Sequence, residues 1–282
     1  MSYDVSAIIP VLGPQPLLQR AIDSALSNAW IGELIVVDDG SAEPLSVASH
    51  PKVRVIRHGN NKGPGAARNT GARAAACNWL AFLDADDVWD KDKTLTQIEA
   101  LKMDSSGAIG AVCAFGFLRG GNRVVCRPPN TRLDFDCALA GARFGLGSTM
   151  VISRAAFLLS NGYDDSYLRY EDWEWLLRIL KGGHFLTLQQ ELVTVSLGNR
   201  AKPSVALDAL GRLLKKELAG ELTPSQARIF NAGIGLERAS LQLAGGQRIT
   251  AAKSILTAML NRPAWVARAV VRRLAGGAIP GV

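Results

Sequence analysis

The amino-acid sequence predicts an α/β fold, a mostly parallel sheet flanked by helices, with an α-helical extension at the C-terminal end. Over the first hundred residues, short apolar runs alternate with segments in which apolar residues recur at helical spacing. Two of these runs end in clusters of aspartates, and from Pro203 onward the chain reads as nearly all helix. We therefore divide the 282 residues into an α/β domain at 1–200 and a basic helical extension at 201–282.

The N-terminal elements follow the strand–helix alternation of a parallel sheet. The four apolar runs predict buried strands at residues 5–10, 34–37, 53–57 and 79–83. Apolar residues on one helical face predict helices at residues 18–26, 65–76 and 95–101. The second of these helices follows a Gly-Pro-Gly turn, but neither the GxGxxG of a dinucleotide fingerprint nor the GxxxxGK(S/T) of a P-loop is present.

Two acidic clusters begin where a predicted strand has just ended. Asp38 and Asp39 follow the second strand, and Asp84, Asp86 and Asp87 follow the fourth. In open α/β sheets ligands bind beyond the carboxyl ends of the strands, so we expect both clusters to line one site. Carboxylates that face one another repel unless a cation or hydrogen-bond donors are present. Alternatively the second cluster is a solvated turn, and its last member, Asp87, fits the start of a helix.

The middle of the chain has a different pattern. Residues 112–118, 123–127 and 149–152 predict short strands, the first two joined as a hairpin by a Gly-Gly-Asn turn. A helix is predicted from Glu171 to about residue 181. Glu171 and Asp172 in its first turn either oppose the helix dipole or belong to a site.

The predicted extension carries the chain's positive charge. Its helices are predicted at residues 205–219, 224–243, 249–260 and 263–274. Residues 198–282 contain 13 basic and 4 acidic residues, a net charge of +9, whereas residues 1–197 have a net charge of −2. The last helix combines arginines with apolar residues, so it either rests on an anionic bilayer or packs its apolar face on the protein. No nucleic-acid motif or aromatic-interleaved basic stripe is present, which argues against a nucleic-acid partner.

The cysteines and the uncharged stretches favour a cytoplasmic protein. The four cysteines lack CxxC spacing and a histidine cluster, which fits reduced thiols better than disulfides or a zinc site. No basic segment precedes the first apolar run, and the longest uncharged stretches, of 15 and 14 residues, fall short of the ~20 residues of a membrane-spanning helix. We expect a protein that is either soluble or bound peripherally to the inner face of the membrane.

Five short motifs follow one another between residues 5 and 181. They are AIIP at 7–10, VVDDGS at 36–41, GAARN at 65–69, FLDADD at 82–87 and EDW at 171–173. Each is weak alone, but the five in this order resemble the family 2 glycosyltransferases. The resemblance implies the GT-A fold, a Rossmann-like mixed sheet flanked by helices, and transfer of a sugar with inversion at its reacting carbon. The helical extension lies outside the resemblance.

The resemblance further implies a nucleotide-sugar donor bound together with a divalent cation. By it, Asp86 is the metal ligand and Asp84 contacts the ribose or a metal-bound water. Asp39 accepts a hydrogen bond from the imide N–H of the base, which favours uracil, and Arg68 reaches the nucleotide or its phosphates. The loop after Pro10 borders the base pocket. A hard cation, Mn²⁺ or Mg²⁺, would neutralise the diphosphate so that it can leave.

The acceptor side is implied by the EDW motif. Asp172 takes the proton of the acceptor hydroxyl as general base, and Glu171 lies beside it. Trp173 belongs to the same side. Of Trp173 and Trp175, one is expected to stack on the acceptor sugar and the other to pack in the core.

The reaction is expected to be a single transfer to a saccharide or a lipid-linked acceptor, because the sequence has no QxxRW box of the processive synthases. A noncatalytic nucleotide-sugar or membrane-binding module on the same fold is the alternative, against which the intact Asp84, Asp86 and Asp172 argue. A sugar-1-phosphate nucleotidyltransferase fits less well, because its basic glycine-rich loop directly follows the first strand. Arg200 or Lys202 is a further candidate for closing over the diphosphate.

Overall fold

The structure is a computed structural model that describes residues 4–129, 132–141, 145–196, 203–216 and 222–274. Within these residues the sheet has ten strands in the order β3-β2-β1-β4-β9-β6-β10-β5, with β7 paired to β6 and β8 to β10. The strands are β1 (Val5–Val11), β2 (Ile31–Asp38), β3 (Val53–Arg57), β4 (Trp79–Phe82), β5 (Val88–Trp89), β6 (Gly110–Arg119), β7 (Asn122–Cys126), β8 (Arg132–Leu133), β9 (Met150–Ser153) and β10 (Phe185–Thr194). Strands β3, β2, β1 and β4 are parallel, and the antiparallel β9 joins them to β6 and β10.

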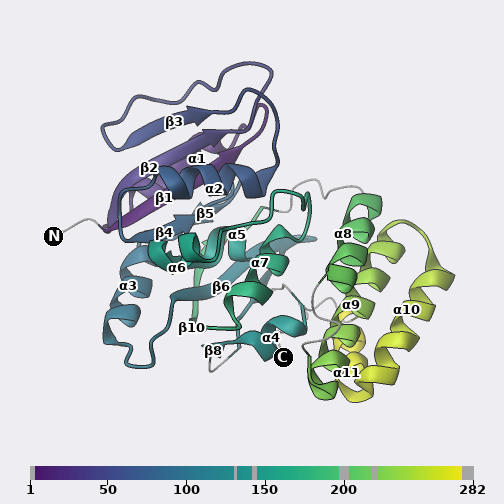
Figure 1. Ribbon diagram of the computed structural model, residues 1–282. Helices are drawn as coiled ribbons and strands as arrows, with labels where there is room; N and C mark the ends of the chain where they lie inside the picture. The colour runs from purple at the N-terminus through teal and green to yellow at the C-terminus, as the bar shows by residue number, and fades with distance from the viewer. Residues whose placement is uncertain (1–3, 130–131, 142–144, 197–202, 217–221, 275–282) are drawn as a thin grey trace.

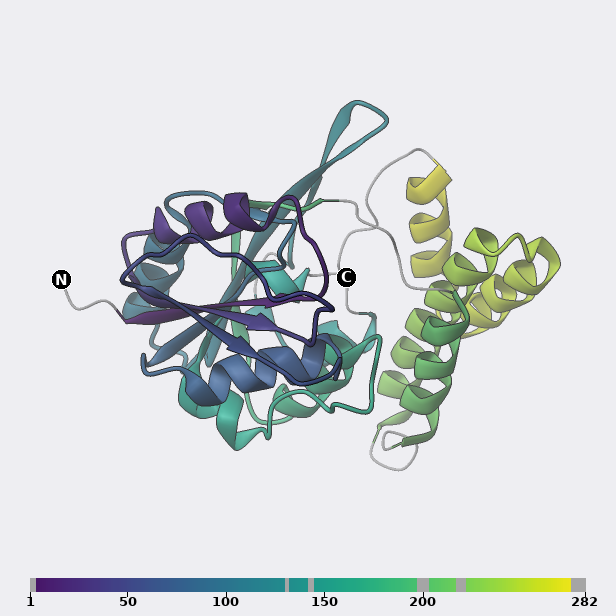
Figure 2. The same ribbon diagram turned by 90° about the horizontal axis from the view of Figure 1, so that it is seen from above.

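Helices cover both faces of this sheet. They are α1 (Leu18–Leu26), α2 (Pro64–Ala74), α3 (Lys93–Met103), α4 (Phe135–Leu139), α5 (Leu146–Thr149), α6 (Arg154–Leu159), α7 (Glu171–Ile179), α8 (Pro203–Lys216), α9 (Pro224–Ala244), α10 (Arg248–Asn261) and α11 (Pro263–Leu274). Figure 1 shows the sheet with its helices on one side of the molecule and α8 to α11 on the other. In Figure 2 the sheet is seen nearly edge-on between α1 and α2.

Two apolar clusters lie on opposite faces of the sheet. One joins Ile8 and neighbouring strand side chains to α2, α6 and α7, and the other joins Ala7 and Ile9 to α1 and α3. Successive side chains of a strand point to opposite faces, and here both faces are covered. This double burial explains why β1, β2 and β4 read as continuous apolar runs rather than as an alternating pattern.

The predicted N-terminal strands and helices are confirmed, with ends that differ by a few residues. Strand β9 begins at Met150, because the predicted first residue, Thr149, ends the short helix α5. Strand β10 was not predicted. It pairs in parallel with β6, and its register shifts on both sides of Glu191. Such an irregularity interrupts the alternation of apolar and polar residues by which strands are recognised.

Helices α8 and α9 share an apolar cluster with the α/β domain. Ala206 of α8 and Phe230 of α9 lie in the same cluster as the side chains of α7. Gly233 allows α9 to approach α4 closely, since a Cβ at this position would lie 2.7 Å from the carbonyl oxygen of Ala140. The extension is therefore packed against the sheet domain and not held to it by the chain alone.

The last helix, α11, packs its apolar face inward. Val266 and Ala269 are buried in a smaller cluster that also contains residues of α9 and α10. This supports the second of the two predictions made for this helix, that its apolar face packs on the protein. Among the residues that the structure describes, no helix combines the length and apolarity needed to cross a bilayer.

Candidate active site

The predicted site residues gather beyond the carboxyl ends of β1, β2 and β4. Asp39 directly follows β2, and Asp84 follows β4 after one intervening leucine. The backbone keeps these ends together, because Asp39 N donates to Val11 O at 2.8 Å and Leu83 N donates to Ile8 O at 3.0 Å. Figure 1 shows β1 to β3 running toward the side of the molecule on which the extension lies.

Pro10 and the loop after it lie at this edge of the sheet. Pro10 is the next-to-last residue of β1 and pairs with Val37 of β2. Just beyond it, Gly13 N donates to the hydroxyl of Ser41 at 2.8 Å, which ties the loop after β1 to the turn after β2. The two loops that would enclose a base are therefore joined to each other.

Asp39 is buried and holds the loop before α2. Its carboxylate accepts hydrogen bonds from the backbone nitrogens of Lys62, at 3.0 Å, and Gly63, at 2.8 Å. The Nδ1 of His58 lies 2.7 Å from the same carboxylate, and the other ring nitrogen of His58 lies 2.9 Å from the hydroxyl of Thr70. The contact of Asp39 with the base stays a prediction, and in this structure the side chain fixes the turn that would surround the base.

Arg68 joins two of the motifs. Its buried guanidinium donates to Asp84 at 2.6 Å and to Glu171 at 3.0 Å, so that the acidic turn after β4 is linked to the start of α7. Burial alone would lower the pKa of Arg68, but the charges of Asp84 and Glu171 outweigh it and the pKa rises. A contact of Arg68 with the nucleotide or its phosphates stays a prediction. In the structure the guanidinium binds carboxylates that lie 87 positions apart, and its Nε has no partner among the described residues.

The acidic turn after β4 holds unbalanced negative charge. Burial and the charge of Asp84 raise the pKa of Asp86. The same two causes raise the pKa of Asp87 to about 7, although Asp87 accepts hydrogen bonds from Ser148 Oγ at 2.6 Å and Ser196 N at 2.8 Å. The expectation that Asp87 starts a helix is wrong, because it precedes β5 and its buried carboxylate anchors the turn to α5 and to residue 196.

The turn fits a divalent cation only together with further oxygen ligands. No three His, Cys, Asp or Glu side chains converge as a metal site anywhere in the part of the chain that the structure describes. The side chain of Asp84 is 40% exposed despite its bond to Arg68, and burial together with the charge of Asp84 raises the pKa of Asp86, an effect that a bound cation would oppose. Mg²⁺ and similar cations are held by one or two carboxylates plus water and substrate phosphates. Asp84 and Asp86 suit that role.

Asp172 has the properties of a base poised near neutral pH. It is half-buried in the first turn of α7 and accepts a hydrogen bond from Trp173 N at 2.8 Å. Burial and the neighbouring charge of Glu171 raise its pKa to about 6, against the lowering effects of Arg169 and Arg68. A general base works best when its pKa lies close to the working pH.

The two tryptophans of the EDW segment are both core residues, which corrects the expectation that one of them stacks on an acceptor sugar. Trp173 is 1% and Trp175 is 0% exposed. The indole of Trp173 donates to Ala138 O and that of Trp175 to Ser160 Oγ, each at 2.8 Å. Trp175 meets Phe185 of β10, and Trp173 meets Phe230 of α9, so the two indoles pack α7 against the sheet and against the extension. Of the EDW residues, Glu171 and Asp172 keep a polar group at the site.

Sequence reasoning missed the segment that lies between Arg68 and α7. Asn69 is buried and binds both backbone groups of Tyr163, with bonds of 2.8 and 2.9 Å, and also Asp165 at 2.8 Å. The ring of Tyr163 lies 5.8 Å from the Arg68 guanidinium, and its hydroxyl is buried with no partner among the described residues. Gly65 leaves room for this segment, since a Cβ there would lie 3.2 Å from Tyr163. The GAARN motif thus holds the segment around Tyr163 in place beside Arg68.

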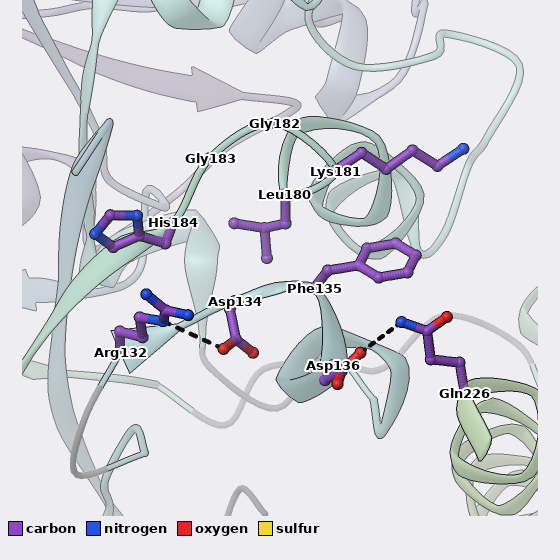
Figure 3. Close-up of a pocket in the computed structure, with 10 residues that line it drawn as sticks. All are labelled: Arg132, Asp134, Phe135, Asp136, Leu180, Lys181, Gly182, Gly183, His184 and Gln226. Carbon is purple, nitrogen blue, oxygen red and sulfur yellow. Dashed lines mark hydrogen bonds and ion pairs between the residues drawn. The ribbon is translucent and has the colours of Figure 1, made fainter. Parts of the chain in front are cut away.

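An open groove of about 380 Å³ lies at the other end of α7 and contains none of the predicted site residues. Figure 3 shows its side chains, with Arg132 facing Asp134 and Asp136 bonded to Gln226 of α9. The groove is lined by Arg132, Asp134, Phe135, Asp136, Leu180, Lys181, Gly182, Gly183, His184 and Gln226. Because Asp172 lies at the start of α7 and this groove at its end, the two are separate features. Arg200 and Lys202 lie outside the described residues.

Comparisons with known proteins agree on one family. A family model described as "Glycosyl transferase family 2" matches residues 6–158. The chain is 40% identical over 114 residues to the succinoglycan biosynthesis protein ExoO of Rhizobium meliloti, which covers 39% of this chain and 32% of that protein. It is 27% identical over 184 residues to an uncharacterised glycosyltransferase of Haemophilus influenzae, covering 63% and 72% of the two chains. The chain thus spans about a third of the length of the first of these relatives.

Solved structures with low sequence identity share the fold. The crystal structure of S. aureus TarS 1–349 in complex with UDP-GlcNAc has a TM-score of 0.64 at 14% identity, over 96% of this chain and 87% of that one. The mannosyltransferase PcManGT from Pyrobaculum calidifontis, in complex with GDP-Man and Mn²⁺, has a TM-score of 0.59 at 19% identity, over 98% and 81%. In both cases the match extends beyond residue 200 into the helical extension.

Proposed function

Because the chain belongs to glycosyl transferase family 2, we propose that it moves a sugar from a UDP-linked donor to a hydroxyl of a saccharide or lipid-linked acceptor, with inversion and with a divalent cation. Membership confirms the transferase class and the GT-A fold predicted from the sequence. The observation that carries the proposal is the Arg68 bridge. It brings the acidic turn, as donor side, and the start of α7, as acceptor side, to one place.

On the donor side, Asp84 and Asp86 would hold Mn²⁺ or Mg²⁺ together with diphosphate oxygens. The cation would neutralise the charge that develops on the departing diphosphate. Two observations support this assignment: the raised pKa of Asp86, and a structural neighbour whose complex contains GDP-Man and Mn²⁺. The preference for uracil rests on Asp39 and on the neighbour in complex with UDP-GlcNAc.

On the acceptor side, Asp172 would take the proton of the attacking hydroxyl. The acceptor oxygen bonds to the anomeric carbon as the bond from that carbon to the diphosphate oxygen breaks. The bonding electrons leave with the nucleoside diphosphate, and attack from the opposite face inverts the configuration. A carboxylate with a pKa of about 6 is mostly ionised at neutral pH and is still basic enough to accept this proton.

Calorimetric titration with UDP, GDP and TDP, in Mn²⁺ and then in EDTA, tests the donor side. We expect one nucleotide, UDP, to bind only with the cation, and Asp86→Asn to lose that dependence. Asp172→Asn should bind UDP like the wild type and fail to transfer the sugar. Full transfer by the Asp172→Asn protein would refute the base. Nucleotide binding without transfer to any acceptor hydroxyl would favour a noncatalytic nucleotide-sugar module on this fold.

The outer face of α10 supports contact with a membrane that presents a lipid-linked acceptor. Ile249, Leu256 and Leu260 recur on one face of the helix and are 77%, 61% and 80% exposed. Lys253 is exposed on the same helix, and residues 238–282 contain seven basic residues and no acidic one. An apolar stripe among cations suits the surface of an anionic bilayer. We propose α10 for this contact rather than α11, because the apolar face of α11 is buried.

Flotation with vesicles tests this contact. The protein should bind vesicles containing phosphatidylglycerol at low salt, and bind poorly to vesicles of phosphatidylcholine alone. Leu256→Ser with Leu260→Ser should weaken binding, whereas Leu118→Ser should not. Leu118 is a suitable control because it is 62% exposed on β6, outside the extension. Binding that ignores the leucines of α10 would contradict the assignment.

A further inference from the structure

The residue before the EDW motif has an unusual backbone conformation. Tyr170 has φ +61°, in the left-handed region that residues other than glycine rarely adopt. Its carbonyl oxygen accepts the first hydrogen bond of α7, from Glu174 N at 2.9 Å. The direction in which Glu171 and Asp172 leave the preceding turn therefore depends on Tyr170. A strained residue of this kind persists only where surrounding contacts hold it.

One of the contacts that hold Tyr170 comes from the extension, and the others come from neighbouring residues. Its hydroxyl donates a hydrogen bond of 2.8 Å to Oε1 of Glu237, a residue of α9 that follows 67 positions later. Its ring is buried and meets Trp173 edge-on, with 5.9 Å between the ring centroids. The guanidinium of Arg169 lies 5.5 Å from the same ring. A hydrogen bond to a charged acceptor is among the stronger ones in proteins.

Helix α9 is fixed against the sheet domain independently of this bond. Phe230 meets Trp173 edge-on at 6.1 Å, and Gly233 lets the helix lie directly on the backbone of Ala140. One turn further on, α9 presents Glu237 to Tyr170. The hydrogen bond thus connects a rigidly packed helix to the strained residue that precedes the base.

We infer that Glu237 and Tyr170 are positioning residues through which the C-terminal extension sets the orientation of Asp172. The inference rests on the role of Asp172 in the proposed function. It gives the extension a part in the reaction, although the extension lies outside the family match at residues 6–158. Burial and the charge of Glu237 raise the pKa of Tyr170, so its hydroxyl stays a donor throughout the working pH range.

Four variants of the full chain test the inference. Tyr170→Phe and Glu237→Leu remove the bond, while Glu237→Gln keeps a side-chain oxygen that can accept it. Gln226→Ala is the matched control, because it breaks another bond of α9, to Asp136 at 2.9 Å, in the separate groove. The readouts are the pKa of Asp172, from carboxyl-carbon NMR shifts of ¹³C-aspartate protein, the turnover of UDP-GlcNAc in Mn²⁺, and the Kd for UDP.

We expect Tyr170→Phe and Glu237→Leu to lower the pKa of Asp172 by at least half a pH unit, because the first turn of α7 opens to water and stabilises the charged form. Turnover should fall tenfold to a hundredfold, as for a base displaced by about 1 Å, with the Kd for UDP within twofold of wild type. The double variant should be no worse than either single one. Glu237→Gln should restore turnover to near wild type, and Gln226→Ala should change none of the readouts.

An unchanged pKa of Asp172 in both Tyr170→Phe and Glu237→Leu would overturn the inference, as would equal changes in the Gln226→Ala control. A loss of UDP binding parallel to the loss of turnover would also overturn it, since that marks a general structural role. Asp172→Asn is measured alongside. If it is inactive while Tyr170→Phe behaves as wild type, the positioning role fails and the proposed function stands. If Asp172→Asn is active, the proposed base fails and the inference falls with it.

Discussion

Replacing Glu171 by glutamine should move the acid limb of the pH–rate profile to lower pH. Asp172 must be ionised to accept a proton, so the wild-type kcat should fall as the pH drops through about 6, the pKa of that carboxyl. The charge of Glu171 is the second cause of this high pKa, after burial. Glu171→Gln removes that negative charge. The positive charge of Arg68 is then offset by one carboxylate fewer and acts more strongly on Asp172. Both effects favour ionised Asp172, so both lower its pKa.

The size of the shift follows from the order of the causes. The pKa of Asp172 is about 6, whereas the ordinary value is 3.8, a difference of roughly two that corresponds to about 3 kcal/mol between the two protonation states. Burial is the larger of the two raising causes, and Arg169, Arg68 and the Trp173 hydrogen bond offset part of their sum, so we take the charge of Glu171 to be worth on the order of 1 kcal/mol, somewhat under one pH unit. We therefore expect the acid limb of the variant between about pH 5 and 5.5.

The assay is kcat for sugar transfer at saturating donor and Mn²⁺ across the acid range, with folding verified by circular dichroism at each pH. Glu174→Gln is the matched control. It makes the same chemical change in the same turn of α7, but Glu174 pairs with Arg178 at 2.6 Å and is not among the causes of the Asp172 shift. Its acid limb should stay at the wild-type pH. A Glu171→Gln profile that coincides with the wild type, or moves upward, would refute the electrostatic reasoning.

Three further predictions concern the metal, a buried lysine and a glycine. Asp86→Asn should weaken UDP binding in Mn²⁺ at least tenfold, toward the absence of binding expected of the wild type in EDTA, as measured by titration calorimetry. Lys93 is fully buried, which lowers its pKa to about 8, so the folded state disfavours its charge and stability should rise with pH from about 8 toward 10.5. Lys93→Met should remove that rise in stability. It should also increase the free energy of unfolding at pH 7 by about 1–2 kcal/mol, a net value that includes the loss of the 2.8 Å hydrogen bond to Gln97. Equal urea midpoints for the variant and the wild type would contradict this. Gly40→Ala should destabilise the fold by roughly 2–4 kcal/mol, because φ at this position is +77° and a methyl group would lie 2.6 Å from Asn61 N. A melting temperature equal to that of the wild type would contradict this and show that the loop can move to make room.

The sequence predicts the N-terminal half of the fold because β1, β2 and β4 are apolar on both faces and because β2 and β4 lead directly into acids. Those two signals located β1, β2 and β4 and the aspartates that follow them. The signals fail where tertiary contacts decide. Trp173 and Trp175 have the composition of a sugar platform, and only the packing of α7 shows that both face the core.

The same limit applies to the charged residues of the site. That Arg68 binds two carboxylates, and that Asp87 is a buried anchor, depends on elements far away in the sequence. Arg68 and Glu171 are 103 residues apart, and the hydroxyl bound to Asp87 belongs to Ser148, 61 residues on. Short motifs name the residue types at a site, but their pairing follows from the fold. The asparagine at the end of GAARN was overlooked because its partners are mostly backbone groups.

Two glycines of α9 are important for its packing because they have no side chain. Gly233 opens one face to the backbone of Ala140, and at Gly235, two positions on, a Cβ would come within 2.9 Å of the Cβ of Ala258 in α10. Because α9 is in close contact on two sides, it has little freedom to shift or rotate. The two glycines thereby fix the position of Glu237. Substitution of either glycine is therefore expected to lower the rate of sugar transfer, although neither glycine contacts the reacting groups. We therefore expect that, among relatives, residue changes at these two positions accompany changes at Glu237 and Tyr170.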